Sequence, residues 1–151
     1  MSLRGTAALA GLAFAALLPA AAFAQTTPCP GIHVSVLNIL NRNGTVACAL
    51  FDSPAGFPRE FLHSAQNAMI IKIRNTAARC DFEAIPPGTY ALVVVHDENS
   101  NGKLDTNLLG IPTEGYGFSN DARAFMGTPS FSAASFSYDG QSLEMTITLH
   151  Y

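Results

Sequence analysis

The chain has 151 residues, a formal net charge of −3 and no tryptophan, and only 13% of its residues are charged. Nucleic acids and anionic membrane surfaces are bound through basic patches, so we expect this acidic chain to bind no nucleic acid. Its length suits one domain with a single core.

The first 24 residues are predicted to be a secretory signal peptide. Arg4 precedes an apolar run, residues 7–24, that ends in AAAFA before Gln25. A basic start, an apolar stretch and a small-residue exit are typical of cleaved signals, whereas a membrane anchor needs about 20 apolar residues without that exit. We therefore expect a periplasmic or secreted protein that does not insert into a membrane after cleavage. It would consist of an N-terminal tail, residues 25–31, and a β-sandwich domain, residues 32–151.

Apolar side chains recur at every second position along most of the mature chain, the period of a half-buried strand. The segment GTYALVVVHD, residues 88–97, is apolar on both faces, as in the central strand of a sheet. Glycine-containing turns separate the apolar runs, and residues 51–64 have room for one short helical turn. We predict an all-β fold, a single seven-stranded antiparallel β-sandwich, with strands at residues 32–39, 45–52, 68–75, 79–85, 89–97, 131–138 and 142–151.

Three cysteines, Cys29, Cys48 and Cys80, follow the predicted cleavage site. An oxidising compartment favours one disulfide and leaves one thiol over. Cys80 alternates with charged neighbours and so faces the core, and Cys48 lies in a strand that is apolar on both faces. We prefer a Cys48–Cys80 bridge between the sheets, with Cys29 as the odd thiol; a link from Cys29 to either partner is the alternative.

One long loop, residues 98–130, follows the predicted central strand. Loops of this length in compact domains are usually functional or disordered, and the aromatic residues here argue against disorder. Exposed aromatic side chains mark interaction surfaces, so we predict a binding surface for a peptide, a glycan or an envelope component. The alternative is that these aromatic residues close one end of the core. The predicted surface consists of Tyr116, Phe118, Arg123 and Phe125.

The start of this loop has the spacing of a calcium-binding loop. Oxygen-bearing side chains stand at alternate positions, as a short loop needs if its oxygens are to converge on one ion, and Gly102 permits the sharp bend. Position twelve is Leu108, so the bidentate glutamate of an EF-hand is missing and Glu114 or Asp121 is needed to complete the site. Affinity is expected to be weak, on the order of 10⁻⁴ to 10⁻³ M. The predicted ligands are Asp97, Asn99, Asn101, the carbonyl of Lys103, and Asp105.

Two other interpretations of the acidic loop remain open. In the first, amide and carboxylate side chains hold a metal-free turn by local hydrogen bonds. In the second, paired carboxylates such as Glu114 and Asp121 act in a hydrolase. His96 alternates with Asp97 on the predicted strand, so the two side chains point to opposite faces and we expect His96 to be a structural histidine.

Two segments carry a family resemblance. PPGTYALVVVHDENSNGKLDTNLLGIPTEGYGFSNDARAFMGTPSF, residues 86–131, and CALFDSPAGFP, residues 48–58, resemble the bacterial exported family called domain of unknown function 2141. The resemblance implies a periplasmic or surface β-sandwich without a known biochemical role. PPGTY entering a strand is also similar, more distantly, to transthyretin-like and collagen-adhesin B-type modules, some of which hold calcium on such loops. That similarity implies an immunoglobulin-like or transthyretin-like sandwich with a structural or binding role rather than a catalytic one.

Overall fold

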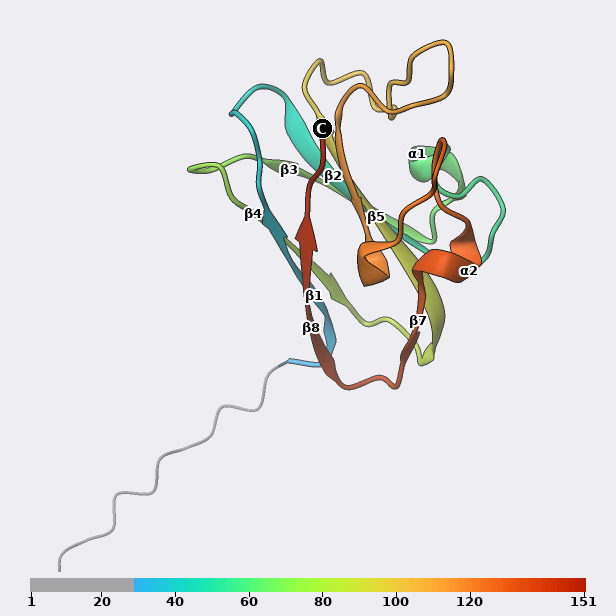
Figure 1. The fold of residues 1–151 in the computed structure, drawn as a ribbon. Coiled ribbons are helices and arrows are strands. Elements are labelled where there is room, and N and C mark those ends of the chain that lie inside the picture. Colours follow the sequence, from blue (N-terminus) through green and yellow to red (C-terminus); the bar gives the residue numbers. More distant parts are fainter. Residues whose placement is uncertain (1–28) are drawn as a thin grey trace, which may run out of the picture.

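The structure, a computed structural model, describes residues 29–151; the predicted signal peptide and residues 25–28 lie outside the described part. Two sheets face each other across a core (Figure 1). The three-stranded sheet has the order β4-β1-β8, with strands Ala78–Glu83, Gly31–Leu37 and Ser142–Thr148. The five-stranded sheet has the order β3-β2-β5-β6, and β7 pairs with the other end of β5. Its strands are β3 Asn67–Lys72, β2 Thr45–Phe51, β5 Gly88–Asp97, β6 Gly115–Phe118 and β7 Ser135–Tyr138.

The main core fills the space between the two sheets. Alternate residues of β1 and β5 point into it and are at most 3% exposed, as strand geometry requires of a face that packs on another sheet. These side chains are Ile32, Val34 and Val36 from β1 and Tyr90, Leu92 and Val94 from β5. The apolar alternation in the sequence therefore corresponds to a real buried face.

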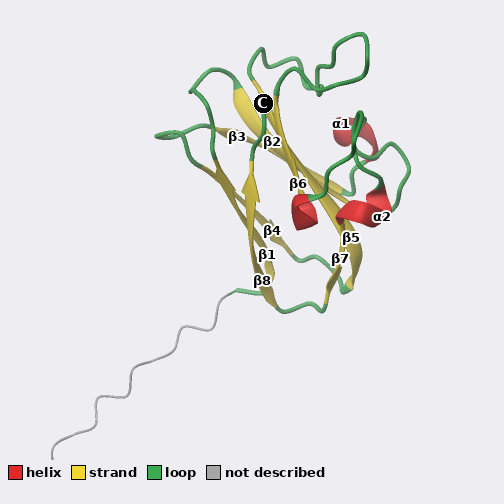
Figure 2. Ribbon diagram, viewed as in Figure 1, coloured by secondary structure: helices red, strands yellow, loops and turns green. Residues whose placement is uncertain are grey.

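A second core covers the outer face of the five-stranded sheet and explains why β5 is apolar on both sides. Ala91, Val93 and Val95 of β5 pack there beneath Phe61 and Phe118. Two short helices lie over this face, α1 at Phe61–Ser64 and α2 at Phe131–Ala134 (Figure 2). Among residues 29–151 no helix is long and apolar enough to span a bilayer.

The all-β class is confirmed, but the predicted single antiparallel sandwich of seven strands is wrong in two respects. The structure has eight strands, because β6 forms inside the predicted long loop; its sequence, GYGF, has two glycines and so lacks a strand signal. The three-stranded sheet is mixed, because β8 runs parallel to β1. The predicted strand at residues 131–138 is split: Ser130 accepts a hydrogen bond from the backbone N–H of Ala133 and caps α2, and only the second half forms β7. The short helical turn expected within residues 51–64 is present as α1.

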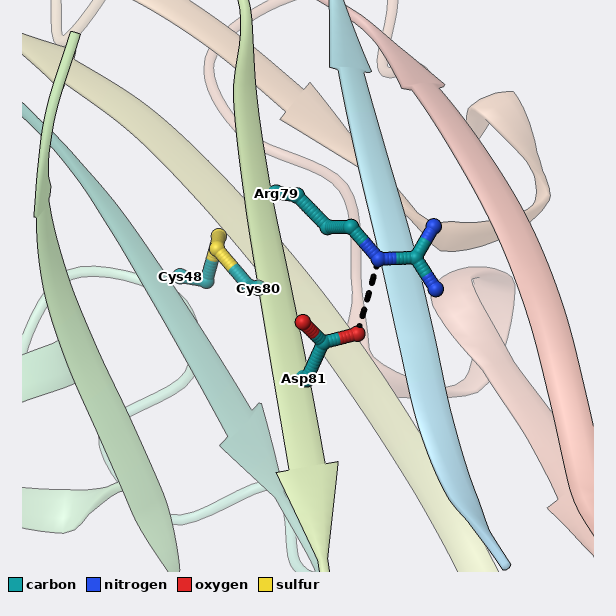
Figure 3. Close-up of a disulfide and its surroundings, with 4 residues drawn as sticks. All are labelled: Cys48, Arg79, Cys80 and Asp81. Atoms are coloured by element: carbon teal, nitrogen blue, oxygen red, sulfur yellow. Dashed lines mark hydrogen bonds and ion pairs between the residues drawn. A yellow bond between two sulfur atoms is a disulfide. The ribbon is translucent and has the colours of Figure 1, made fainter. Parts of the chain in front are cut away.

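A disulfide joins the two sheets at the predicted pair, Cys48 on β2 and Cys80 on β4. Figure 3 shows both side chains meeting between the strands, while Arg79 and Asp81 beside Cys80 bond to each other away from the bridge. Both cysteines are completely buried, and Cys29 is a free, exposed thiol. The prediction from strand phase is confirmed.

The first test of this fold removes the bridge, which closes a chain segment with a sequence separation of 32 residues. In a Cys29→Ser background, the double variant Cys48→Ala/Cys80→Ala should lose about 3.5 kcal/mol of unfolding free energy, because the unfolded chain regains the entropy of that loop. Urea unfolding measures the loss. Cys29→Ser alone should leave stability unchanged; destabilisation by this variant would contradict the assignment of Cys29 as the unpaired cysteine.

His33, on β1, bonds both to the segment before β1 and to β4. Its Nδ1 lies 2.7 Å from Asp81 Oδ1 and its Nε2 lies 2.9 Å from the carbonyl oxygen of Cys29. Both partners only accept hydrogen bonds, so both ring nitrogens carry a proton when both bonds form. The bond to the Cys29 carbonyl, followed by the bond to Asp81, raises the pKa of His33 above its ordinary value.

The second test follows from this raised pKa. Stabilisation by protonated His33 is complete below its unfolded pKa, near 6.5, and is lost as the pH rises through the higher folded pKa. The variant His33→Gln should therefore be less stable than wild type at pH 5.5 and should lose less stability between pH 6.5 and 8.5. Thermal unfolding across this range checks the effect. The exposed His63→Gln serves as control; a wild-type pH profile for His33→Gln would contradict the pairing.

Candidate functional site

The candidate site lies where β5 ends, at the edge of the five-stranded sheet. Asp97 is the last residue of β5 and only 3% of it is exposed, although it carries a carboxylate. Burying a carboxylate is unfavourable unless hydrogen bonds or a cation compensate it. The surroundings of Asp97 therefore decide what this site can do.

Backbone N–H groups of the loop surround Asp97. The N–H of Asn101 donates to Oδ1 at 3.0 Å, and the N–H of Gly102 donates to Oδ2 at 2.7 Å. The side-chain oxygens of Asn99 and Asn101 each accept a hydrogen bond from the N–H two residues further on, at Asn101 and Lys103. Gly102 has a φ of +75°, the left-handed conformation that glycine adopts without strain. The loop therefore curls around its first carboxylate, as the sequence spacing predicts.

Asp105 and Glu114 come later in the chain and bond back to the start of the loop. Asp105 Oδ2 accepts from the amide Nδ2 of Asn99 at 2.7 Å and from that of Asn101 at 2.9 Å. Glu114, the residue before β6, accepts from the N–H of Glu98 at 3.1 Å and from the N–H of Asp105 at 3.1 Å, and is 6% exposed. Glu114 thus ties the start and the end of the acidic loop together.

Electrostatics at Glu114 are unfavourable for its charged form. Burial is the largest effect and raises the pKa of this carboxyl; the charges of Asp105 and Asp97 raise it further, while the two backbone N–H bonds lower it. Among residues 29–151, no Lys, Arg or His nitrogen pairs with Asp97, Asp105 or Glu114 within 4.0 Å. Two buried carboxylates and a third beside them therefore lack a cationic partner.

In this arrangement the side chains of the loop do not converge as a set of metal ligands. Within the described part of the chain, no three His, Cys, Asp or Glu side chains come together in a group that holds a metal as they stand. The amide N–H groups of Asn99 and Asn101 point to Asp105, where a cation would otherwise neutralise it. Calcium binding would therefore require both amides to turn their oxygens inward.

Of the two carboxylates named to complete the site, only Glu114 lies at the loop. Asp121 follows β6 in a short 3₁₀ turn and bonds to Arg123 at 3.2 Å and to His150 at 3.3 Å. The bonds to His150 and then Arg123 lower the pKa of Asp121, so this group is already neutralised. Asp121 therefore belongs to a separate polar cluster.

His96 is completely buried and its ring is fully bonded. Nε2 lies 2.8 Å from the carbonyl oxygen of Asn43, and Nδ1 lies 2.7 Å from the hydroxyl of Tyr151. A neutral ring satisfies both contacts, donating to the carbonyl and accepting from the hydroxyl. His96 thus fixes the C-terminus against β5 and turns away from the acidic loop.

The predicted aromatic surface is divided between core and solvent. Phe118 is 3% exposed within the second core, and the half-buried ring of Tyr116 packs against it with centroids 5.7 Å apart. Arg123 is exposed but bonded to Asp121 and His150. Phe125 alone projects fully into solvent, at 104% exposure. Phe118 is therefore buried and does not contribute to an accessible binding surface.

Besides Phe125, the structure exposes four large apolar residues in the two loops on either side of β6, which sequence reasoning missed. The loop after Asp105 and the loop after Arg123 meet here, since a Cβ on Gly127 would lie 4.0 Å from the carbonyl oxygen of Gly110. The turn at residues 107–111 is held by Asn107, whose Oδ1 accepts from the N–H of Leu109 and of Ile111. The signal was available in LLGI, an apolar run within a polar loop. We call this group the apolar tips; it consists of Leu108, Leu109, Ile111, Phe125 and Met126.

The third test concerns the loop without metal. Asp97→Ala should cost about 1 to 3 kcal/mol of unfolding free energy in the presence of a chelator, because the N–H groups of Asn101 and Gly102 lose their acceptor. Asp139→Ala is the matched control, since exposed Asp139 accepts a single N–H from Gln141 and should cost far less. Equal losses in the two variants, measured by urea unfolding, would contradict the anchoring role of Asp97.

Comparison with known proteins gives one match. The family model DUF2141, described as an uncharacterised protein conserved in bacteria, matches residues 34–146, which include both sheets and the acidic loop. No curated protein and no solved structure matches the chain.

Proposed function

This chain belongs to the bacterial protein family DUF2141, and from that premise we propose that it is an exported, non-catalytic β-sandwich module that binds calcium weakly at its acidic loop. The calcium-ordered loop holds the apolar tips in place as a contact surface for a component of the cell envelope. Its role is structural or adhesive in the periplasm or outside the cell.

The observation that carries this proposal is a buried carboxylate pair with no basic side chain of residues 29–151 beside it. Asp97 and Glu114 are 3% and 6% exposed, Asp105 lies beside them, and their mutual repulsion contributes to the raised pKa of Glu114. A divalent cation would remove this repulsion and favour the ionised forms. Calcium is the ion that fits best, because it accepts six to eight oxygen ligands in flexible loops.

The ligands follow from the position of each oxygen. Asp97, the last residue of β5, and Glu114, the residue before β6, adjoin paired strands and supply the rigid part of the site. Asn99, Asn101, the carbonyl of Lys103 and Asp105 supply the mobile part. Bound calcium would place a full positive charge beside the carboxylates of the loop. In the structure these carboxylates are stabilised by N–H dipoles. With three carboxylates and an amide rearrangement to complete, affinity should be weak, on the order of 10⁻⁴ to 10⁻³ M.

The contact surface is proposed from exposure. Leu108 and Phe125 are more than 100% exposed, and Leu109 and Met126 are above 70%. Large apolar side chains gathered in exposed loops mark interaction sites on soluble proteins. Leu108 follows Asp105 by three residues, so an ion at the loop would order the chain that presents it. A peptide, a glycan or another envelope component is the partner class.

A metal-free structural module is the second candidate, favoured by the hydrogen bonds from Asn99 and Asn101 to Asp105, which close the loop by themselves. A hydrolase is less well supported. Both oxygens of Glu114 accept backbone N–H groups, and Asp121 is bonded to Arg123 and His150. Neither carboxylate is placed as one of a facing acid–base pair.

The fourth test is thermal and chemical unfolding with and without calcium. At 10 mM calcium, the unfolding free energy should rise by about 1.4 to 2.7 kcal/mol for dissociation constants of 10⁻³ to 10⁻⁴ M. Asp97→Asn and Glu114→Gln should lose this increment, because each removes a ligand charge. Magnesium at the same concentration should stabilise less.

Asp121→Asn is the matched control, because it changes the net charge by the same amount but removes an exposed carboxylate outside the loop. This variant should keep the full calcium-dependent rise in unfolding free energy. The proposal fails if calcium gives the wild type no increment beyond that of magnesium. It also fails if Asp121→Asn loses the increment as completely as Asp97→Asn does, because calcium would then bind elsewhere.

A further inference from the structure

A groove of about 800 Å³ lies on the side of the molecule opposite the contact surface, at the turn that carries the chain from β3 to β4. β3 is an edge strand of the five-stranded sheet and β4 an edge strand of the three-stranded sheet, and in Figure 1 their connection projects at the left. The groove is therefore formed where both sheets end. Its walls come from the end of β1, from β3, from the turn and from the start of β4.

The floor and walls of this groove are apolar. Val36 is 1% exposed and Ile71 packs against the main core, so the groove reaches the margin of that core. Leu37 and Ile70 are 50% and 59% exposed, which is high for large apolar side chains that line a concavity. A volume of this size is within the range of small-molecule sites.

The charged residues that line the groove are all basic. Lys72, Arg74 and Arg79 line it, three of the seven basic residues in the described part of an acidic chain, and none of the lining residues is acidic. Arg79 is neutralised by Asp81 at 2.9 Å and by Glu144 at 3.1 Å. Within residues 29–151, Lys72 and Arg74 have no carboxylate within 4.0 Å. Two cations with no acidic partner among the described residues therefore line an apolar groove.

From this juxtaposition we propose that the groove binds a long-chain carboxylate, a fatty-acid-like amphiphile, with its alkyl chain along Val36, Ile70 and Ile71 and its head group beside Lys72 and Arg74. Charge complementarity selects an anionic head group, and the apolar walls select a hydrocarbon tail. The ligand is a free fatty acid, whose carboxylate is the head group that Lys72 and Arg74 would meet. This inference is independent of the calcium site, which lies on other loops.

The test uses the absence of tryptophan from the chain. Ile70→Trp places a single reporter in one wall of the groove, and Leu37→Trp places it in another. Laurate below its micellar concentration should shift the emission of both reporters to shorter wavelength, and bromine-labelled laurate should quench them. Leu108→Trp, at the apolar tips, is the control and should show neither change. Vesicles containing phosphatidylglycerol form a second arm that separates lipid-borne chains from free fatty acid.

Charge variants test the head-group contact. In the Ile70→Trp protein, Lys72→Glu/Arg74→Glu should weaken laurate binding at least about tenfold, whereas Arg42→Glu/Arg59→Glu, with the same change in net charge, should not. The proposal is overturned if laurate leaves the groove reporters unchanged, even where the vesicles affect them, if dodecanol binds as well as laurate, or if Leu108→Trp responds equally. A blue shift of Ile70→Trp that grows with protein concentration alone would assign the groove to a second copy of the chain instead.

Discussion

The burial of β5 on both faces is the constraint on which the rest of the structure depends. One face closes the main core against the three-stranded sheet, and the other forms the second core beneath α1 and α2. Because both faces are used, the polar chain that follows β5 can begin only where the strand ends, at Asp97. The acidic loop, the short strand β6 and the apolar tips are all placed by this one transition from buried strand to polar loop.

Much of this arrangement could be predicted from the sequence. Strand phase identified the Cys48–Cys80 bridge, because alternation along a strand shows which residues face inward. The run before Asp97 could be predicted as the central strand because it is apolar on both faces. The loop around Asp97 followed from local chemistry, since Asn, Asp and Gly at these spacings bond to their own backbone and need no distant partner.

Other features depended on contacts between distant segments, which no local pattern encodes. β6 contains two glycines and forms because β5 offers it an edge, and β8 pairs in parallel with β1 because the chain crosses from one sheet to the other after β7. Spacing could not choose between Glu114 and Asp121; the pairing of β6 with β5 brings Glu114 to the loop, whereas Asp121 lies beside Arg123 and His150. The sequence did not distinguish Phe118 from Phe125, but in the structure only Phe118 packs into a core.

We propose that Asp97, Asp105 and Glu114, which have no basic side chain of residues 29–151 within 4.0 Å, form a calcium site that hydrogen bonds hold closed until the ion arrives. The most direct measurement is a crystal structure of the mature protein grown in millimolar calcium, with anomalous data to identify the ion. We expect one calcium ion ligated by Asp97 and Glu114, with the side-chain oxygens of Asn99 and Asn101 turned toward it. A loop without an ion, still closed by the amides of Asn99 and Asn101 on Asp105, would contradict it.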